Sequence, residues 1–389
     1  MKKEAKNKKI LFVMQSLRIG GAERELVTLA NKLTENGYDV TIILWMARFD
    51  FRDSLDKRVR LIYKAPDKHL GNYIPYIRHK YYDDWMWSER ASLKQLYRYY
   101  VGREKYDVEI AFFHSRSLDI VAGSTNKKAL HLAWIHNDIH LFDNTGTKQW
   151  RKSKEKIIKI GSIVCVSDEI SKEYDREFGH ICSITTIRNL LPVEQIIQQS
   201  KEEPKYHVKK ARLHLVLVAR FDDQNKGQLR LINAVGKLRA CGCDISLSLV
   251  GEGSDKELIQ NSVREKALDD AVTVIEGQTN PYPYIKEADL LVCASYTEGY
   301  NLTVAEALIL GTPVLSTACA GPSEILDNGK YGMIVENSGS GLFHGIKKLY
   351  DDPKLLEEYR QKTVERMDFI DEEKIFKQIT DLFDQEIDQ

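Results

Sequence analysis

Two glutamates, Glu298 and Glu306, are separated by seven residues in the stretch whose residue types best suit chemistry. The preceding apolar run, Asp289–Ser295, predicts a buried strand, and Asn301 favours a helix that begins near Leu302. That helix is apolar on nearly every side, so a carboxylate on it costs several kcal/mol, roughly, unless hydrogen bonds satisfy it. A buried structural glutamate is one interpretation. The other is a nucleotide site, because free N–H groups at the helix start suit a phosphate and Glu306 could bind two ribose hydroxyls.

A pair of cations, Arg220 and Lys226, follows another apolar run, Leu213–Ala219, which predicts a strand. Two cations that flank one loop at the carboxyl end of a strand could bind a diphosphate. A solvated loop is equally compatible with this spacing. No Asp-x-Asp stands at a strand end where it could hold Mg²⁺ against a diphosphate, so we expect neither a metal nor another cofactor.

The first half of the chain begins with a strand, a glycine loop and a helix. Ile10–Met14 is an apolar run, and Gly20 and Gly21 follow it. The next stretch, Ala22–Leu33, has helical periodicity. This order cradles phosphates in doubly wound sheets, although a tight turn is the commoner explanation and the G-x-G-x-x-G fingerprint is absent. His136 follows a later apolar run, at the point where open α/β sheets bind ligands.

Strands and helices alternate through both halves of the chain, which predicts an α/β fold with parallel sheets. The 389 residues are enough for two domains with separate cores. A polar stretch with Pro192, a glutamine-rich run and several lysines indicates a linker between them. The predicted organisation is a Rossmann-like domain at 1–190, a linker at 191–212, a second Rossmann-like domain at 213–365 and a C-terminal helix at 366–389 that packs back on the first domain.

Composition and charge predict a cytoplasmic protein. The formal net charge is zero, so no overall field favours nucleic acid. Six scattered cysteines, most of them in apolar runs, indicate a reducing compartment. The basic start, Met1–Lys9, is followed by an apolar run, Ile10–Met14, that is too short for a signal peptide, and no run reaches transmembrane length.

The stretch from Lys68 to Lys105 combines aromatic and basic side chains. Tyrosines and tryptophans interleaved with Arg and Lys suit a membrane interface. A large helical packing face, with Arg and Lys side chains that extend to solvent, is the alternative. We predict peripheral contact with the inner face of the plasma membrane through residues 73–105.

The wider stretch Ser295–Val314 resembles the E-x7-E signature of the retaining glycosyltransferases of family 4. These enzymes have the GT-B fold, in which two Rossmann-like domains face one cleft and a C-terminal helix crosses back. Arg220 and Lys226 fit the family's R-x5-K-G frame, and His136 fits a position beside the donor sugar. The resemblance implies transfer of a hexosyl or N-acetylhexosaminyl unit from a nucleotide-sugar, expected to be a UDP-sugar, to a glycan, lipid-linked glycan or cell-surface polysaccharide.

The resemblance also implies a role for each site residue. Arg220 and Lys226 would neutralise charge on the leaving diphosphate, aided by backbone N–H groups. Glu306 would hold the ribose and Glu298 the hexose hydroxyls, while His136 would contact the transferred sugar. The residues expected to act in catalysis are His136, Glu298, Arg220 and Lys226, and those expected to bind the donor are Gly20, Gly21, Arg220, Lys226, Gly251, Gly277, Glu298, Tyr300, Asn301, Leu302, Thr303 and Glu306.

Two other functions remain compatible with the sequence. One is a nucleotide-sugar epimerase of the GT-B fold, which would need further acidic residues in the cleft. The other is a non-catalytic partner subunit that binds a nucleotide-sugar. The presence of all four charged residues of the donor site argues against the partner subunit, because an idle copy does not need them.

Overall fold

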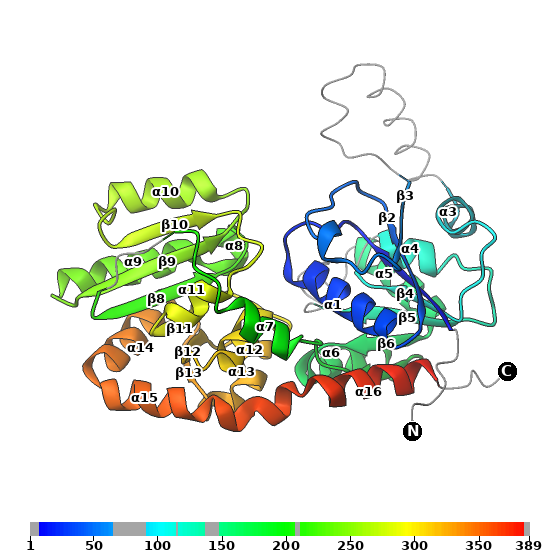
Figure 1. The fold of residues 1–389 in the computed structure, drawn as a ribbon. Helices are drawn as coiled ribbons and strands as arrows, with labels where there is room; N and C mark the ends of the chain where they lie inside the picture. The colour runs from blue at the N-terminus through cyan, green and yellow to red at the C-terminus, as the bar shows by residue number, and fades with distance from the viewer. Residues whose placement is uncertain (1–7, 65–90, 114–115, 137–147, 207–210, 385–389) are drawn as a thin grey trace, which may run out of the picture. The chain divides into compact units, whose positions relative to one another are not determined.

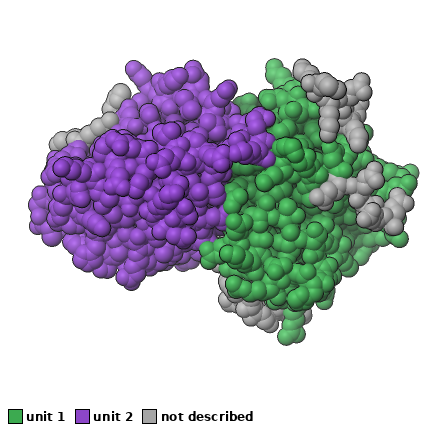
Figure 2. Space-filling view, turned by 90° about the horizontal axis from the view of Figure 1, so that it is seen from below, with its two compact units in different colours: residues 1–190, 375–389 green, residues 191–374 purple. Residues whose placement is uncertain are grey.

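The computed structural model describes residues 8–64, 91–113, 116–136, 148–206 and 211–384. The chain divides into two compact units, which Figure 2 distinguishes by colour. Unit 1 comprises Met1–Leu190 and Ile375–Gln389, and unit 2 comprises Leu191–Lys374. Each unit is an α/β structure with one parallel sheet, as the alternation of strands and helices predicts (Figure 1).

The described part of unit 1 is organised around a sheet of strand order β3-β2-β1-β4-β5-β6-β7. The chain moves outward from β1 to β3 and then returns to the other side of β1 with β4. Ile10, Phe12 and Ile110 are fully buried, as expected of strands with helices on both faces. The strands are β1 (Lys9–Met14), β2 (Asp39–Leu44), β3 (Arg60–Tyr63), β4 (Val108–Ala111), β5 (Leu130–Ile135), β6 (Ser162–Cys165) and β7 (Ser183–Thr186).

Helices before and after these strands cover the sheet of unit 1. Helices α3, α4 and α5 contact one another in succession. Lys32 of α1 lies over the ring of Phe376 in α16, whose residues from Ile375 onward belong to unit 1. The helices are α1 (Gly21–Glu35), α3 (Leu93–Tyr100), α4 (Arg116–Val121), α5 (Lys148–Ile160), α6 (Asp168–Phe178) and α16 (Glu372–Phe383).

Only the end of the aromatic and basic segment lies within the described residues, because residues 65–90 fall outside them. In α3, Tyr97 and Tyr100 are buried, and the Tyr97 hydroxyl donates a hydrogen bond to Glu109. This part of the segment packs on the sheet, and the membrane contact of the segment stays a prediction. Among the described residues, no helix combines the length and the hydropathy that a membrane span requires.

Unit 2 contains a second parallel sheet, with strand order β10-β9-β8-β11-β12-β13 in its described residues. The chain again starts in the middle of the sheet and changes direction between β8 and β11. The strands are β8 (Leu213–Val218), β9 (Ile245–Gly251), β10 (Val272–Glu276), β11 (Leu290–Cys293), β12 (Val314–Thr317) and β13 (Met333–Val335).

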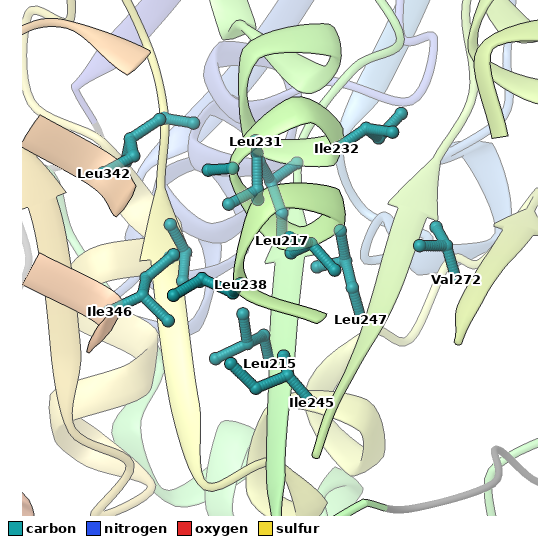
Figure 3. Close-up of a cluster of buried hydrophobic side chains, with 14 of the residues drawn as sticks. Leu215, Leu217, Leu231, Ile232, Leu238, Ile245, Leu247, Val272, Leu342 and Ile346 are labelled. Atoms are coloured by element: carbon teal, nitrogen blue, oxygen red, sulfur yellow. The ribbon is translucent and has the colours of Figure 1, made fainter. Parts of the chain in front are cut away.

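Two groups of helices enclose the sheet of unit 2. Helix α9 packs against α10 and α14, and α7 packs against α11 and α12. Figure 3 shows Leu231 and Leu238 of α9 and Ile346 of α14 in one cluster with Leu215 and Leu247 of the sheet. Each such buried side chain contributes about 1.5–3 kcal/mol. The helices are α7 (Val193–Gln199), α8 (Asp223–Lys226), α9 (Gln228–Ala240), α10 (Lys256–Glu265), α11 (Tyr282–Glu287), α12 (Leu302–Ile309), α13 (Ala320–Ile325), α14 (Gly339–Asp351) and α15 (Pro353–Lys362).

The segments on both sides of unit 2 differ in detail from the expected linker and C-terminal helix. Residues 191–212 contain α7, where Ile196 is fully buried and the Gln199 carbonyl accepts a hydrogen bond from Asn280. Helix α7 packs against α11 and α12, so the polar composition of this stretch conceals a helix that is part of unit 2. At the other end, α16 begins at Glu372, after a 3-10 segment at Val364–Ile370.

Candidate functional site

The charged motif residues of unit 2 follow the two strands between which the chain changes direction. Arg220 and Lys226 follow β8, and Glu298 follows β11. These strands pair in parallel, with Leu290 beside Leu215. Loops at the carboxyl ends of parallel strands at such a switch point form the ligand site of open α/β sheets. The sheet order therefore brings both motifs, distant in sequence, to one edge.

Lys226 and Glu298 form an ion pair at this edge. The Lys226 Nζ donates to Glu298 Oε1 at 2.7 Å, and the Ser295 hydroxyl donates to the same oxygen at 2.6 Å. The two charged side chains are 21% and 10% exposed. The sequence assigns these residues to different parts of a donor, and the structure shows that they contact each other directly.

Helix α12 begins at Leu302 with Asn301 as its N-cap, as predicted. The Asn301 side chain accepts a hydrogen bond from the Val304 N–H at 3.1 Å, and the Thr303 hydroxyl donates to the Val218 carbonyl in β8. A cavity of about 10 Å³ lies against Lys226, Asn301 and Thr303. The first N–H groups of α12 and the Lys226 ammonium are both suited to an anion.

Glu306 is in the second turn of α12 and is only 1% exposed. The Tyr282 hydroxyl of α11 donates a hydrogen bond to its Oε1 at 3.4 Å. Burial of a carboxylate costs free energy unless the group is hydrogen-bonded. Glu306 is therefore suited either to a structural contact or to binding a hydroxyl of a ligand.

Arg220 differs from the other motif residues because its side chain is 44% exposed. Its Nη2 is 3.4 Å from Asp222 Oδ2, and its carbonyl accepts a hydrogen bond from Gln228 at the start of α9. The backbone of Arg220 is thus fixed, while its guanidinium group remains available to solvent or a ligand.

Arg230 is a structural part of the site that the motif analysis missed. Its guanidinium group donates to the carbonyls of Ala294 and Ser295 and lies 3.8 Å from the centroid of the Tyr296 ring. Burial lowers the pKa of Arg230. Arg230 thus fixes the backbone of Ala294 and Ser295, just after β11. The sequence gives little signal for this role, because α9 carries other polar and charged residues as well.

The two candidate glycines of unit 2, Gly251 and Gly277, are required by different features of the backbone. Gly251 ends β9, and a Cβ at this position would collide with the Ala219 carbonyl, so the close approach of the β8 loop requires glycine here. Gly277 has a left-handed backbone with φ of 65°, and no atom lies within 4 Å of the place where a Cβ would be.

In unit 1, the glycine loop and His136 follow two strands that flank β4. Gly20 is the N-cap of α1, and its carbonyl accepts the Arg24 N–H at 3.0 Å. His136 directly follows β5 and is 7% exposed, with its ring 4.6 Å from the ring of Phe112, measured between centroids.

Glu25 is a partner of His136 that the sequence analysis did not identify. Its Oε2 is 3.3 Å from Nδ1 of His136. A glutamate among the buried positions of α1 was the available signal, but nothing in the sequence links it to a histidine so distant in the chain. Among the described residues, no cluster of His, Cys, Asp and Glu has the arrangement of a metal site.

Family models match both units of the chain. Residues 19–195 match the model described as Glycosyltransferase Family 4, and residues 212–352 match the model described as Glycosyl transferases group 1. The chain is also 28% identical over 189 residues to the N-acetylgalactosamine-N,N'-diacetylbacillosaminyl-diphospho-undecaprenol 4-alpha-N-acetylgalactosaminyltransferase of Campylobacter jejuni. That match covers 48% of this chain and half of the relative's length.

Solved structures share the fold over nearly the whole chain. The crystal structure of TarM of S. aureus has a TM-score of 0.74 at 16% identity and covers 97% of this chain and 99% of its own. HepE of Anabaena, in complex with UDP and glucose, has a TM-score of 0.71 at 16% identity, with coverage of 96% and 99%. At these identities the likeness concerns the fold. Together with the family models and the motifs at β8 and β11, it shows that the chain belongs to the family-4-type glycosyltransferases with the GT-B fold.

Proposed function

We propose that the protein is a retaining, metal-independent transferase that moves a hexosyl or N-acetylhexosaminyl unit from a UDP-sugar to a glycan or lipid-linked glycan. The observation that carries this proposal is the ion pair of Lys226 and Glu298 beside the start of α12. A cation suited to a diphosphate and a carboxylate suited to sugar hydroxyls are neighbours there. A nucleotide-sugar presents a diphosphate and sugar hydroxyls in neighbouring parts of one molecule.

Two findings in related proteins support the choice of donor and acceptor. HepE, which shares the fold, has been crystallised with UDP and glucose. The name of the Campylobacter jejuni relative specifies transfer of N-acetylgalactosamine in alpha configuration to a diphospho-undecaprenol-linked sugar. We extend both to this chain as a UDP-sugar donor and a lipid-linked or free glycan acceptor.

In the proposed reaction, the bond from the anomeric carbon to the diphosphate breaks, and the acceptor oxygen bonds to that carbon on the same face. As UDP leaves, the proton of the acceptor hydroxyl passes to the departing diphosphate oxygen. Lys226 and Arg220 neutralise charge that develops on the diphosphate. Glu306 holds the ribose, Glu298 holds the hexose hydroxyls, and His136 contacts the transferred sugar.

The test is incubation of the purified protein with a set of UDP-hexoses and UDP-N-acetylhexosamines, with and without polyprenyl-diphosphate-linked sugar acceptors. We expect UDP release that depends on the acceptor, and a product whose new linkage keeps the anomeric configuration of the donor in an NMR spectrum. An epimerised donor without a transfer product would support an epimerase instead. Binding of donors without any turnover would support a non-catalytic partner subunit.

A further inference from the structure

Glu25, in the second turn of α1, contacts two other parts of unit 1. Its Oε2 is 3.3 Å from His136 Nδ1, and the two side chains are 1% and 6% exposed. The backbone of Leu190, which follows β7, also favours the charged form of this carboxyl group. Burial holds the pKa of Glu25 above its usual value, although His136 and the Leu190 backbone lower it. One carboxyl group therefore connects α1, the end of β5 and the segment after β7.

The contact occupies only one of the two ring nitrogens of His136. Nε2 is buried and has no hydrogen-bond partner among the described residues. A carboxylate oxygen that faces Nδ1 favours a proton on that nitrogen, because an ionised carboxylate only accepts hydrogen bonds. A ring that gives its Nδ1–H to a carboxylate keeps Nε2 as an acceptor.

We propose that Glu25 is a positioning residue for His136: it fixes the orientation of the ring and the proton on Nδ1, and thereby keeps Nε2 unprotonated to accept a hydrogen bond from a hydroxyl of the transferred sugar. The part that concerns turnover rests on the proposed function, whereas the orientation and tautomer of the ring do not. Carboxylates serve histidines in this way where the second ring nitrogen binds a metal or moves a proton.

The opposite end of β5 supplies a matched control. His131 Nε2 is 3.4 Å from Oε2 of Glu109, whose side chain is fully buried. The Tyr97 hydroxyl donates to Glu109 Oε1 at 2.7 Å. His131 is the second residue of β5, at its amino end, whereas ligands of parallel sheets bind at the carboxyl ends of the strands. Glu109→Gln therefore alters a buried Glu–His contact of the same kind without touching His136.

The first test is the tautomer of His136 in ¹⁵N-histidine-labelled protein, with its signals assigned by their loss in His136→Gln. At a pH where the ring is neutral, we expect a proton on Nδ1 and none on Nε2. Glu25→Leu removes the acceptor and should end the dominance of the Nδ1–H form, while the amide oxygen in Glu25→Gln still accepts and should preserve it. Glu109→Gln should leave the His136 signals unchanged. No substrate is needed, so this test decides positioning even in a protein that transfers no sugar.

Turnover tests the consequence of that positioning. Glu25→Leu should lower kcat roughly tenfold, within the range for losing a carboxylate that orients a functional imidazole, with UDP affinity unchanged. Glu25→Gln should lower kcat by a smaller factor. In a protein that already carries His136→Ala, Glu25→Leu should not lower kcat further, because Glu25 acts through the ring. Glu109→Gln should lower Tm and leave kcat unchanged.

Two results would overturn the inference. One is a His136 in the wild-type protein that carries no proton on Nδ1. The other is a loss of kcat on Glu25→Leu that is equal in the presence and absence of His136. A wild-type protein with the expected tautomer but no sugar transfer would overturn the proposed function and leave the positioning intact.

Discussion

The Lys226–Glu298 pair of unit 2 and the Glu25–His136 pair of unit 1 each join a carboxylate to a basic group beyond the carboxyl ends of central strands, yet their surroundings differ. Water reaches both members of the first pair, and the Ser295 hydroxyl shares its carboxylate. The second pair is almost completely buried and is fixed further by the backbone of Leu190.

The difference in burial implies a difference in role. An ion pair that water can reach loses less when it exchanges partners than a fully buried pair does, so a diphosphate can replace Glu298 as the partner of Lys226. Removing one member of a buried pair costs about 3–5 kcal/mol, because the other is left without compensation. The accessible pair is therefore suited to exchange partners with a ligand, and the buried pair is suited to hold one geometry.

The largest expected effect is that of removing Lys226 of the accessible pair, or Arg220 on the same loop. Lys226→Ala and Arg220→Ala should each lower turnover by roughly 10²–10³, the scale for losing one preorganised electrostatic contact. Lys347→Ala, which removes an exposed lysine paired with Asp351 on α14, is the control and should keep full turnover. Steady-state kinetics with the preferred UDP-sugar measures the losses. A wild-type rate for Lys226→Ala would contradict the idea that a diphosphate replaces Glu298 as the partner of Lys226.

Substitution in the buried pair should lower turnover of the sugar and leave the binding of the nucleotide unchanged. His136→Ala is expected to lower turnover roughly 10²-fold, the low end of the range for one contact to developing charge. The affinity for free UDP, measured by calorimetry, should stay unchanged, because the proposed partner of His136 is the hexose. A large loss of UDP affinity would show that the two pairs do not divide the donor in this way.

The two glutamates of the E-x7-E motif sharpen the comparison within unit 2. Glu306→Gln should weaken the binding of both UDP and UDP-sugar, by roughly 10- to 100-fold for lost hydrogen bonds to a charged group. Glu298→Gln should preserve UDP binding and lower turnover, because its proposed partner is the sugar. The opposite pattern would reverse the two roles. If both variants only lose thermal stability, the carboxylates are structural.

The smallest expected effect is that of metal removal. Lys226 and Arg220 are proposed to supply the positive charge that other transferases take from a divalent ion. Turnover should therefore be the same in excess EDTA as in buffer with Mg²⁺ or Mn²⁺. Loss of activity on chelation, with recovery on adding the ion, would mean that the cation pair is not sufficient.

The parts that the sequence predicted well depend on local patterns. Apolar runs predicted the strands, and Asn301 predicted the start of α12 at Leu302. The motif residues around Glu298 are contiguous, so their chemistry could be interpreted before their position in the sheet was known. Register and sheet order then explain why the loop of Lys226 meets the loop of Glu298.

The contacts that the sequence could not predict join distant segments through tertiary packing. Glu25 and His136 meet only because β1, β4 and β5 are neighbours in one sheet, and no local period connects them. Arg230 is one of several polar and charged residues on α9, and pattern alone cannot distinguish its buried position from an exposed one. Its partners are backbone carbonyls, which carry no sequence signal.

The division of the chain into units has a consequence for its synthesis. Unit 2 is contiguous, whereas unit 1 is completed by α16, whose Ile379, Leu382 and Phe383 are buried. A ribosome therefore releases all of unit 2 before it releases the last segment of unit 1. Until then the nascent chain keeps apolar surface of unit 1 uncovered, the condition in which partly made proteins aggregate or recruit chaperones.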